Sequence, residues 1–104
     1  MIKHIVTFKF AGDTITERLE SAADAKRSLE SLNGMIPQIV SLVVGIDPGI
    51  SDTHWDAVLY SEFATPADLD TYQAHPEHVR VAAHVGSLTA SRSIVDYTTP
   101  DSAS

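Results

Sequence analysis

The sequence pattern that organises this fold comes first in the chain, in the run Ile2-Lys3-His4-Ile5-Val6-Thr7-Phe8-Lys9-Phe10. Its even-numbered residues are apolar apart from His4, whereas its odd-numbered residues include two lysines and a threonine. Because successive side chains of a strand point to opposite faces, this alternation predicts a strand with one buried face. We therefore expect His4 on the buried side, beside Val6 and Phe8.

A helix is predicted directly after this strand. Gly12-Asp13 ends the strand, and Thr14 followed three residues later by Glu17 is a capping-box pattern, in which each side chain can bind the other residue's backbone N–H. Apolar residues then recur at spacings of three or four as far as Leu32. Asn33-Gly34 ends the helix, since glycine readily adopts the left-handed conformation after a last turn.

The rest of the chain predicts three more strands and a bent helix. Strands are expected over 40–46, 55–63 and 90–97. Between the last two, a helix begins near Thr65-Pro66 and runs to about His75, where Pro76 bends it into a further segment that ends at Leu88. Residues 98–104 are expected to form a flexible C-terminal tail.

This order of elements predicts the fold class. An α+β, ferredoxin-like βαββαβ domain is expected over residues 1–97, with helices on one face of an antiparallel four-stranded sheet. The other face also needs a cover, because the strand over 40–46 has no plainly polar side and the strand over 55–63 carries Val58 and Tyr60 opposite its helix-facing set. A homodimer that stacks two such sheet faces is the simplest cover.

The composition excludes several classes of function. Seven Lys and Arg residues against fourteen Asp and Glu residues give a formal net charge of −7, so neither nucleic acid nor a membrane surface is an expected partner. There is no cysteine, which excludes disulfides and thiolate chemistry. Without a secretory signal, or an apolar run near the roughly 20 residues of a membrane helix, a cytoplasmic protein is expected.

The densest chemistry lies in the run Tyr72-Gln73-Ala74-His75-Pro76-Glu77-His78. Tyr72 shares a helix face with Leu69, and His78 lies on the apolar stripe of the next segment, so both should point inward. His4 should project toward them from the first strand. Such a convergence within an apolar pocket is typical of a small-molecule site. We expect the pocket to be lined by Phe8, Ala57, Leu59, Val81 and Ala82.

These residues allow two interpretations. A neutral His78 imidazole can accept a proton while the Tyr72 phenol donates a hydrogen bond to a carbonyl or enolate oxygen. Alternatively, Tyr72, His78 and His4 merely satisfy one another beneath the helices. His75 is expected to serve the helix end, and His84 to face solvent.

No metal or cofactor site is predicted. The acidic loop formed by Asp47, Asp52, His54 and Asp56 offers oxygen ligands to a hard cation but matches no calcium-binding spacing, so a solvated turn is the favoured interpretation. The motifs of zinc proteases, phosphate-binding loops, dinucleotide sites and serine hydrolases are missing from the sequence.

An ordered set of fragments resembles one known family, the stress-responsive dimeric α/β-barrel (Dabb) domain, from Lys3 to about Tyr97. The resemblance implies a ferredoxin-like monomer that pairs sheet to sheet into a homodimeric α+β barrel, and many members of the family have no assigned activity. The fragments are Lys3 to Phe10, Ile36-Pro37, Val44-Gly45-Ile46-Asp47, Ser61-Glu62-Phe63, Tyr72 to Val79, and Val95-Asp96-Tyr97.

One branch of that family is a cofactor-independent polyketide cyclase, which performs an intramolecular aldol closure. The resemblance to this branch places its tyrosine at Tyr72, one histidine at His78 and another at His4. A further histidine of the cyclase corresponds to Ala57 in this chain, and the nearby His54 lies outside the strand. The pocket therefore carries over from the resemblance more readily than the cyclisation reaction.

The residues together with this resemblance favour a homodimer of the stress-responsive family with a small apolar pocket in each subunit, which binds an unidentified apolar or aromatic molecule without a cofactor. One alternative is a cofactor-independent carbon-acid enzyme, with His78 as the general base and Tyr72 as the hydrogen-bond donor. Another is a monooxygenase of the similarly folded antibiotic-biosynthesis type. A structural dimer without a ligand is the remaining interpretation.

Overall fold

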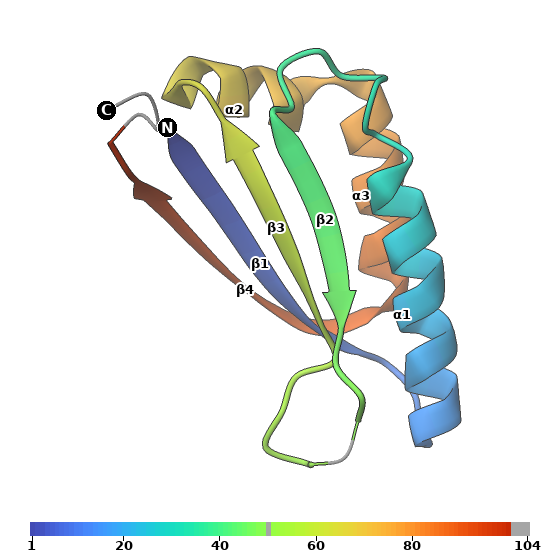
Figure 1. Ribbon diagram of the computed structural model, residues 1–104. Helices are drawn as coiled ribbons and strands as arrows, with labels where there is room; N and C mark the ends of the chain where they lie inside the picture. The colour runs from blue at the N-terminus through green and yellow to red at the C-terminus, as the bar shows by residue number, and fades with distance from the viewer. Residues whose placement is uncertain (50, 101–104) are drawn as a thin grey trace.

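The computed structural model describes residues 1–49 and 51–100 (Figure 1). Four strands and three helices follow one another in the predicted order. Each predicted boundary lies within two residues of the observed one. The elements are β1 (Ile2–Phe10), α1 (Ile15–Glu30), β2 (Ser41–Ile46), β3 (Ala57–Phe63), α2 (Pro66–Ala74), α3 (Pro76–Leu88) and β4 (Thr89–Thr98).

The four strands form one antiparallel sheet in the order β2-β3-β1-β4. β1 is an inner strand, where His4 pairs with Ser61 of β3 on one side and with Asp96 of β4 on the other. Directly paired residues of an antiparallel sheet share a face, so this register decides which β4 side chains lie on the side of His4. The predicted ferredoxin-like βαββαβ fold is confirmed.

Local signals in the sequence start the helices where predicted. The Thr14 hydroxyl accepts a hydrogen bond from the Glu17 backbone N–H at 3.1 Å, and the Thr65 hydroxyl accepts one from Asp68 at 3.1 Å. The capping box at Thr14 differs in one detail, because the Glu17 carboxylate accepts from the Thr14 hydroxyl at 3.0 Å rather than from its backbone N–H. Both caps satisfy donors that a helix leaves unpaired.

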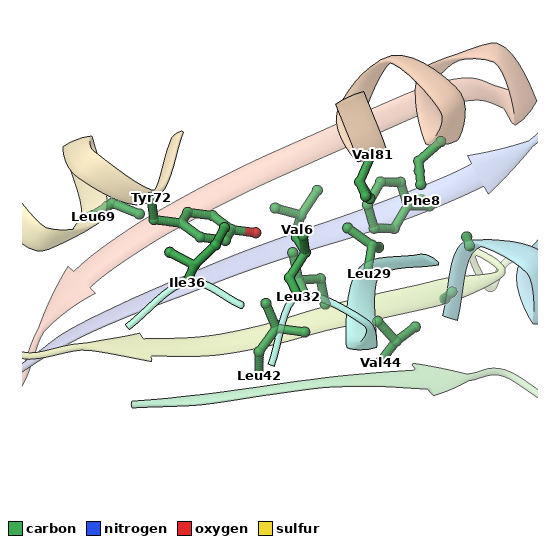
Figure 2. Packing of buried hydrophobic residues seen from close by; sticks show 14 of the residues in the cluster. Val6, Phe8, Leu29, Leu32, Ile36, Leu42, Val44, Leu69, Tyr72 and Val81 are labelled. Atoms are coloured by element: carbon green, nitrogen blue, oxygen red, sulfur yellow. The ribbon is translucent and has the colours of Figure 1, made fainter. Parts of the chain in front are cut away.

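All three helices lie on one side of the sheet, and the opposite side carries no covering element in Figure 1. Figure 2 shows the core between the two layers, where Val6 and Phe8 of β1 lie near Leu29 of α1 and Val81 of α3. Burial of these apolar side chains is the main favourable term that holds the helices on the sheet.

The uncovered side of the sheet, called here the open sheet face, carries one apolar row across all four strands. Val43, Tyr60, Ile5 and Val95 are paired in succession from β2 to β4. Val43 and Val95 are 46% and 59% exposed, far more than core residues. The neighbouring row contains an ion pair between Lys3 and Glu62.

The two ends of the described chain meet beside the sheet. Thr98 is the last residue of β4, and Thr99 donates a backbone hydrogen bond to the Met1 carbonyl at 2.9 Å. The Met1 amino group donates in return to the Thr99 carbonyl at 2.8 Å. Residues 101–104 of the predicted tail, and Ile50 of the acidic loop, lie outside the described residues.

Candidate functional site

A single non-helical residue, His75, separates α2 from α3. Its backbone is extended, with φ −62° and ψ 134°, as expected for a residue before proline. Its Nδ1 accepts a hydrogen bond from the backbone N–H of Glu77 at 3.1 Å, so the imidazole caps the start of α3. We expected His75 to interact with the free carbonyls at the end of α2. Its ring instead caps the N-terminus of α3.

This junction brings Tyr72, from the end of α2, against His78, from the first turns of α3. Their ring centroids are 4.4 Å apart and the rings are tilted by 53°. The His4 ring of β1 meets Tyr72 edge-on at 6.4 Å. Phe63 of β3 completes the cluster, with its ring centroid 4.8 Å from that of Tyr72.

Tyr72 is fully buried within this cluster, at 0% exposure. Its hydroxyl makes no hydrogen bond with any residue in the described ranges 1–49 and 51–100. Burial raises the pKa of the phenol to about 12, so it is protonated at neutral pH. Buried hydroxyls nearly always have a partner, which makes this one the exceptional polar group of the core.

The proton on His78 has a defined position. Its Nδ1 lies 3.0 Å from the backbone carbonyl oxygen of Gln73, and a carbonyl can only accept. Nδ1 is therefore the donor, and Nε2 carries the lone pair of the neutral ring. Burial is the largest cause that lowers the pKa of His78; the hydrogen bond to Gln73 opposes it, and electrostatic interactions with His4 and Arg92 lower the pKa further.

His4 has a carboxylate partner that sequence reasoning did not identify. Its buried ring places Nδ1 2.5 Å from Oδ1 of Asp96, on the neighbouring strand β4. The carboxylate accepts this hydrogen bond, so the His4 proton at Nδ1 and the orientation of the ring are both fixed. The register between β1 and β4 produces the contact, because His4 and Asp96 are directly paired.

A cavity of about 680 Å³ lies beside this cluster, between α3, β1 and β4; we call it the α3–β4 cavity. This volume falls within the usual range for small-molecule sites, roughly 300–1,000 Å³. Its lining is mostly apolar and also includes both imidazoles. The lining residues are His4, Val6, Phe8, Leu29, Gln73, His78, Ala82, Ala83, Val85, Gly86, Thr89, Ala90, Ser91, Arg92 and Ile94.

Four of the predicted site residues line this cavity, namely His4, His78, Phe8 and Ala82. Tyr72 is in ring contact with His78 and His4 but lies outside the lining, because the two imidazoles stand at the wall.

Three further residues that we expected to line the pocket lie elsewhere, in the hydrophobic core. Ala57 and Leu59 belong to β3, which is separated from β4 by β1, and Val81 is 2% exposed in the layer between helices and sheet. The α3–β4 cavity thus lies on the β4 side of β1, whereas Ala57 and Leu59 lie on the β3 side.

The lining residues that sequence reasoning missed come mainly from β4 and the end of α3. Arg92 and Ile94 pair with Phe8 and Val6, so both share the helix-facing side of the sheet. The alternation Arg92, Ile94, Asp96 was visible in the sequence. It acquires meaning only from the β1–β4 register, since the same residues on the other face would lie far from His78.

The other titratable residues singled out from the sequence lie apart from this cavity. His84 is on the exposed side of α3, as expected, and its Nε2 lies 2.9 Å from Oδ1 of Asp24 on α1. His54 Nδ1 lies 3.1 Å from Oδ1 of Asp47 in the acidic loop.

Among the described residues, no group of three or more histidine, aspartate or glutamate side chains is arranged to hold a metal ion. None of the helices in the described ranges is long and apolar enough to span a bilayer.

Comparison with known proteins identifies a matching family. The model of the stress responsive A/B barrel domain, Dabb, matches residues 2–99 of the chain. A stress-response A/B barrel domain-containing protein of Arabidopsis thaliana is 33% identical over 81 residues, which is 78% of this chain. The match spans only 30% of the length of that relative.

Solved structures with the same fold support this assignment. A dimeric protein of unknown function with a ferredoxin-like fold, from Bacteroides fragilis, superimposes with a TM-score of 0.80 at 36% identity, and the match covers 94% of this chain and 95% of the other. An antibiotic biosynthesis monooxygenase and a hydroxynitrile lyase from Passiflora edulis are each 16% identical, with TM-scores of 0.74 and 0.72. Those matches cover 97% and 95% of this chain and 100% and 96% of the other chains. At that identity the similarity shows the fold alone.

Proposed function

This chain belongs to the stress responsive A/B barrel domain family, and from that premise we propose that it acts as a homodimer in which each subunit binds a small apolar or aromatic molecule in the α3–β4 cavity. The observation that carries the proposal is the 680 Å³ cavity with an apolar lining and two oriented imidazoles at its wall. A few convergent polar groups in an otherwise apolar cavity give a ligand its orientation.

Two features support binding rather than a purely structural role for the cluster. In a structural role, the polar groups of the core would satisfy one another. The Tyr72 hydroxyl has no hydrogen-bond partner among the described residues. His78 Nδ1 donates its hydrogen bond to the Gln73 backbone carbonyl and not to the tyrosine. His78 Nε2 is thereby left as an acceptor on a side chain that lines the cavity.

The open sheet face supports the homodimer. Its row Val43-Tyr60-Ile5-Val95 is a contiguous apolar strip, of the kind that marks an interaction surface. The Lys3–Glu62 ion pair balances its own charges on that face. The B. fragilis protein, the relative with 36% identity, is itself dimeric. A two-fold dimer would cover the strip on both subunits at once.

A second candidate function, a cofactor-independent carbon-acid enzyme, is favoured by the protonation of His78. The hydrogen bond to Gln73 fixes the proton at Nδ1, and the lowered pKa keeps the ring neutral, so Nε2 can act as a general base toward a bound C–H acid. Tyr72 packs against His78 and does not line the cavity, so it would donate to the developing enolate oxygen only after the His78 ring moves.

Ligand binding can be tested by filling the cavity at Gly86. This glycine lies within α3 and lines the cavity, and a Cβ built there meets nothing within 4 Å. Gly86→Leu should therefore place an apolar side chain in the space that a ligand would occupy, and it also replaces a poor helix former. Thermal-shift screening of aromatic and alkyl compounds should yield hits with the wild-type protein that Gly86→Leu loses.

Ala67→Leu is the matched control, because Ala67 is an exposed alanine of α2 outside the cavity. It should retain every hit. Hits that Gly86→Leu also retains would place the ligand elsewhere and refute the proposed site. If the wild-type protein converts a confirmed ligand, and His78→Gln still binds that ligand but no longer converts it, the enzyme becomes the favoured function.

A further inference from the structure

Arg92 is the one cationic residue in the α3–β4 cavity whose position neither the sequence motifs nor the family assignment explains. It pairs with Phe8 in the β1–β4 register, so its side chain leaves the sheet on the helix-facing side. It lines the cavity together with His78. Within the described residues its guanidinium forms no ion pair or hydrogen bond.

The charge balance around Arg92 differs from that of the whole molecule. The chain has a net charge of −7, yet no aspartate or glutamate is among the described residues that line the cavity. The carboxylate that shares this face of β4 is Asp96, four residues along the strand and thus about 13 Å away by strand rise. Asp96 is already occupied by His4 Nδ1. An anion beside Arg92 would therefore meet little repulsion within the cavity.

Apolar side chains from three elements line the cavity around Arg92. Val6 and Phe8 of β1, Leu29 of α1 and Val85 of α3 contribute side chains that would accept a hydrocarbon or aromatic group. Arginine binds a carboxylate through two parallel hydrogen bonds, which orients the ligand as well as holding it. A phosphate site would call for more donors, such as a nest of backbone N–H groups, than a single arginine on a regular strand offers.

Building on the proposed ligand-binding function, we infer that the natural ligand is an amphipathic carboxylate whose carboxylate binds Arg92 and whose apolar body lies against Phe8, Leu29 and Val85. Arg92 is then the residue that selects for a charged end group, while His78 faces the body of the ligand. A negative charge at Arg92 would also counter the positive field that this arginine exerts on His78.

The test compares 4-phenylbutyrate with its neutral amide, 4-phenylbutyramide, by ligand-observed NMR titration on the full chain. The wild-type protein should bind the carboxylate at least about tenfold more tightly than the amide, because a hydrogen bond to a charged group is the stronger kind. In Arg92→Gln this ratio should fall to near one, with the amide affinity unchanged.

Arg80→Gln is the control, since it changes the net charge equally on α3, outside the cavity, where Arg80 pairs with Glu77. It should keep the preference for the carboxylate. The inference is overturned if Arg92→Gln keeps the preference, if Arg80→Gln loses as much of it, or if the wild-type protein does not bind the carboxylate at millimolar concentration. If Gly86→Leu removes both compounds while Arg92→Gln changes neither, only the role of Arg92 fails. If Gly86→Leu removes neither, the proposed cavity itself fails.

Discussion

The Nδ1 atom of His78 donates a hydrogen bond to the backbone carbonyl of Gln73, 3.0 Å away, across the junction between α2 and α3. The carbonyl belongs to the last turn of α2, where backbone acceptors lack helical partners. One bond therefore satisfies an acceptor at the end of one helix and fixes the tautomer of a histidine on the next. The chemistry available to the cavity follows from that tautomer.

His78 should titrate below the ordinary histidine value of 6.5, because burial lowers its pKa. The ¹⁵N shifts of the His78 ring should show the Nδ1–H tautomer at pH 7, and their titration midpoint should lie below 6.5. The pKa of His78 is lower in the folded protein than in the unfolded chain. The stability that depends on the neutral ring is therefore fully present above about pH 6.5, and it is lost as the pH falls from there through the folded pKa. His78→Gln should flatten the fall in stability. A midpoint above 6.5 would contradict the assignment.

Tyr72→Phe should leave the ligand-free protein at least as stable as the wild type. The substitution removes a hydroxyl that is buried without a partner among the described residues, and such a group costs about 1–3 kcal/mol. Urea unfolding measures the change in the free energy of unfolding. Tyr60→Phe, at a half-buried tyrosine of the open sheet face, serves as the comparison. A clear loss of stability at position 72 would reveal a hydrogen bond to the phenol.

His75→Ala should destabilise the protein by about 1 kcal/mol, the usual cost of losing an N-cap. The reason is that His75 Nδ1 accepts the Glu77 backbone N–H at the start of α3. His75→Asn should restore most of the loss, because asparagine is a good N-cap residue with an extended backbone. Chemical denaturation of the three proteins at pH 7 tests this. Equal destabilisation by both variants would mean that the ring packs rather than caps.

Asp24 should make the link between α1 and α3 sensitive to acid. Its hydrogen bond with His84 is the largest cause that lowers the pKa of Asp24 below its ordinary value of 3.8. The stabilisation is present above that value and is lost as the pH falls through the lower, folded pKa. Both side chains are partly exposed, so the amount should be about 0.2–1 kcal/mol. Unfolding of Asp24→Asn between pH 5 and 2 should lack this loss, whereas Asp70→Asn should retain it.

Val95→Asp should convert the dimer to a monomer at micromolar concentration. Val95 ends the apolar row of the open sheet face and is 59% exposed in the single subunit, so the substitution should disturb the dimer more than the fold. Light scattering should report half the mass of the wild-type protein. Val79→Asp is the matched control, with 55% exposure on α3 in the helical layer, and should stay dimeric. A wild-type monomer would exclude the dimer outright.

The fold was predictable because short-range signals and the burial pattern agree along this chain. The alternation in β1, the caps at Thr14 and Thr65, and the proline after His75 each act over a few residues, and each produces the expected structure. The open sheet face was also predictable, because the strand over 40–46 has apolar residues on both of its sides. The fold can be predicted from local rules when the residues at the ends of each helix and strand specify where it begins and ends.

The site was predictable only as far as single elements reach. Tyr72 and His78 lie close in sequence, so helix geometry brings them together once Pro76 bends the chain. Asp96 and Arg92 depend on pairing between the first and last strands, which no local pattern specifies. The same gap explains why Ala57 and Leu59 were expected at the wall, since their strand lies on the other side of β1. Long-range register decides a site built across a sheet.

The reciprocal backbone hydrogen bonds between Met1 and Thr99 have a consequence for protein architecture. A domain whose entry and exit points adjoin can be inserted into a loop of a host protein, or strung in tandem, without disturbing its strands. The same adjacency permits a circular permutant, in which a short glycine linker joins the old ends and new ends open in the acidic loop between β2 and β3. In such a permutant β3 would be synthesised before β1, while the order of strands in the sheet and the cavity would stay the same.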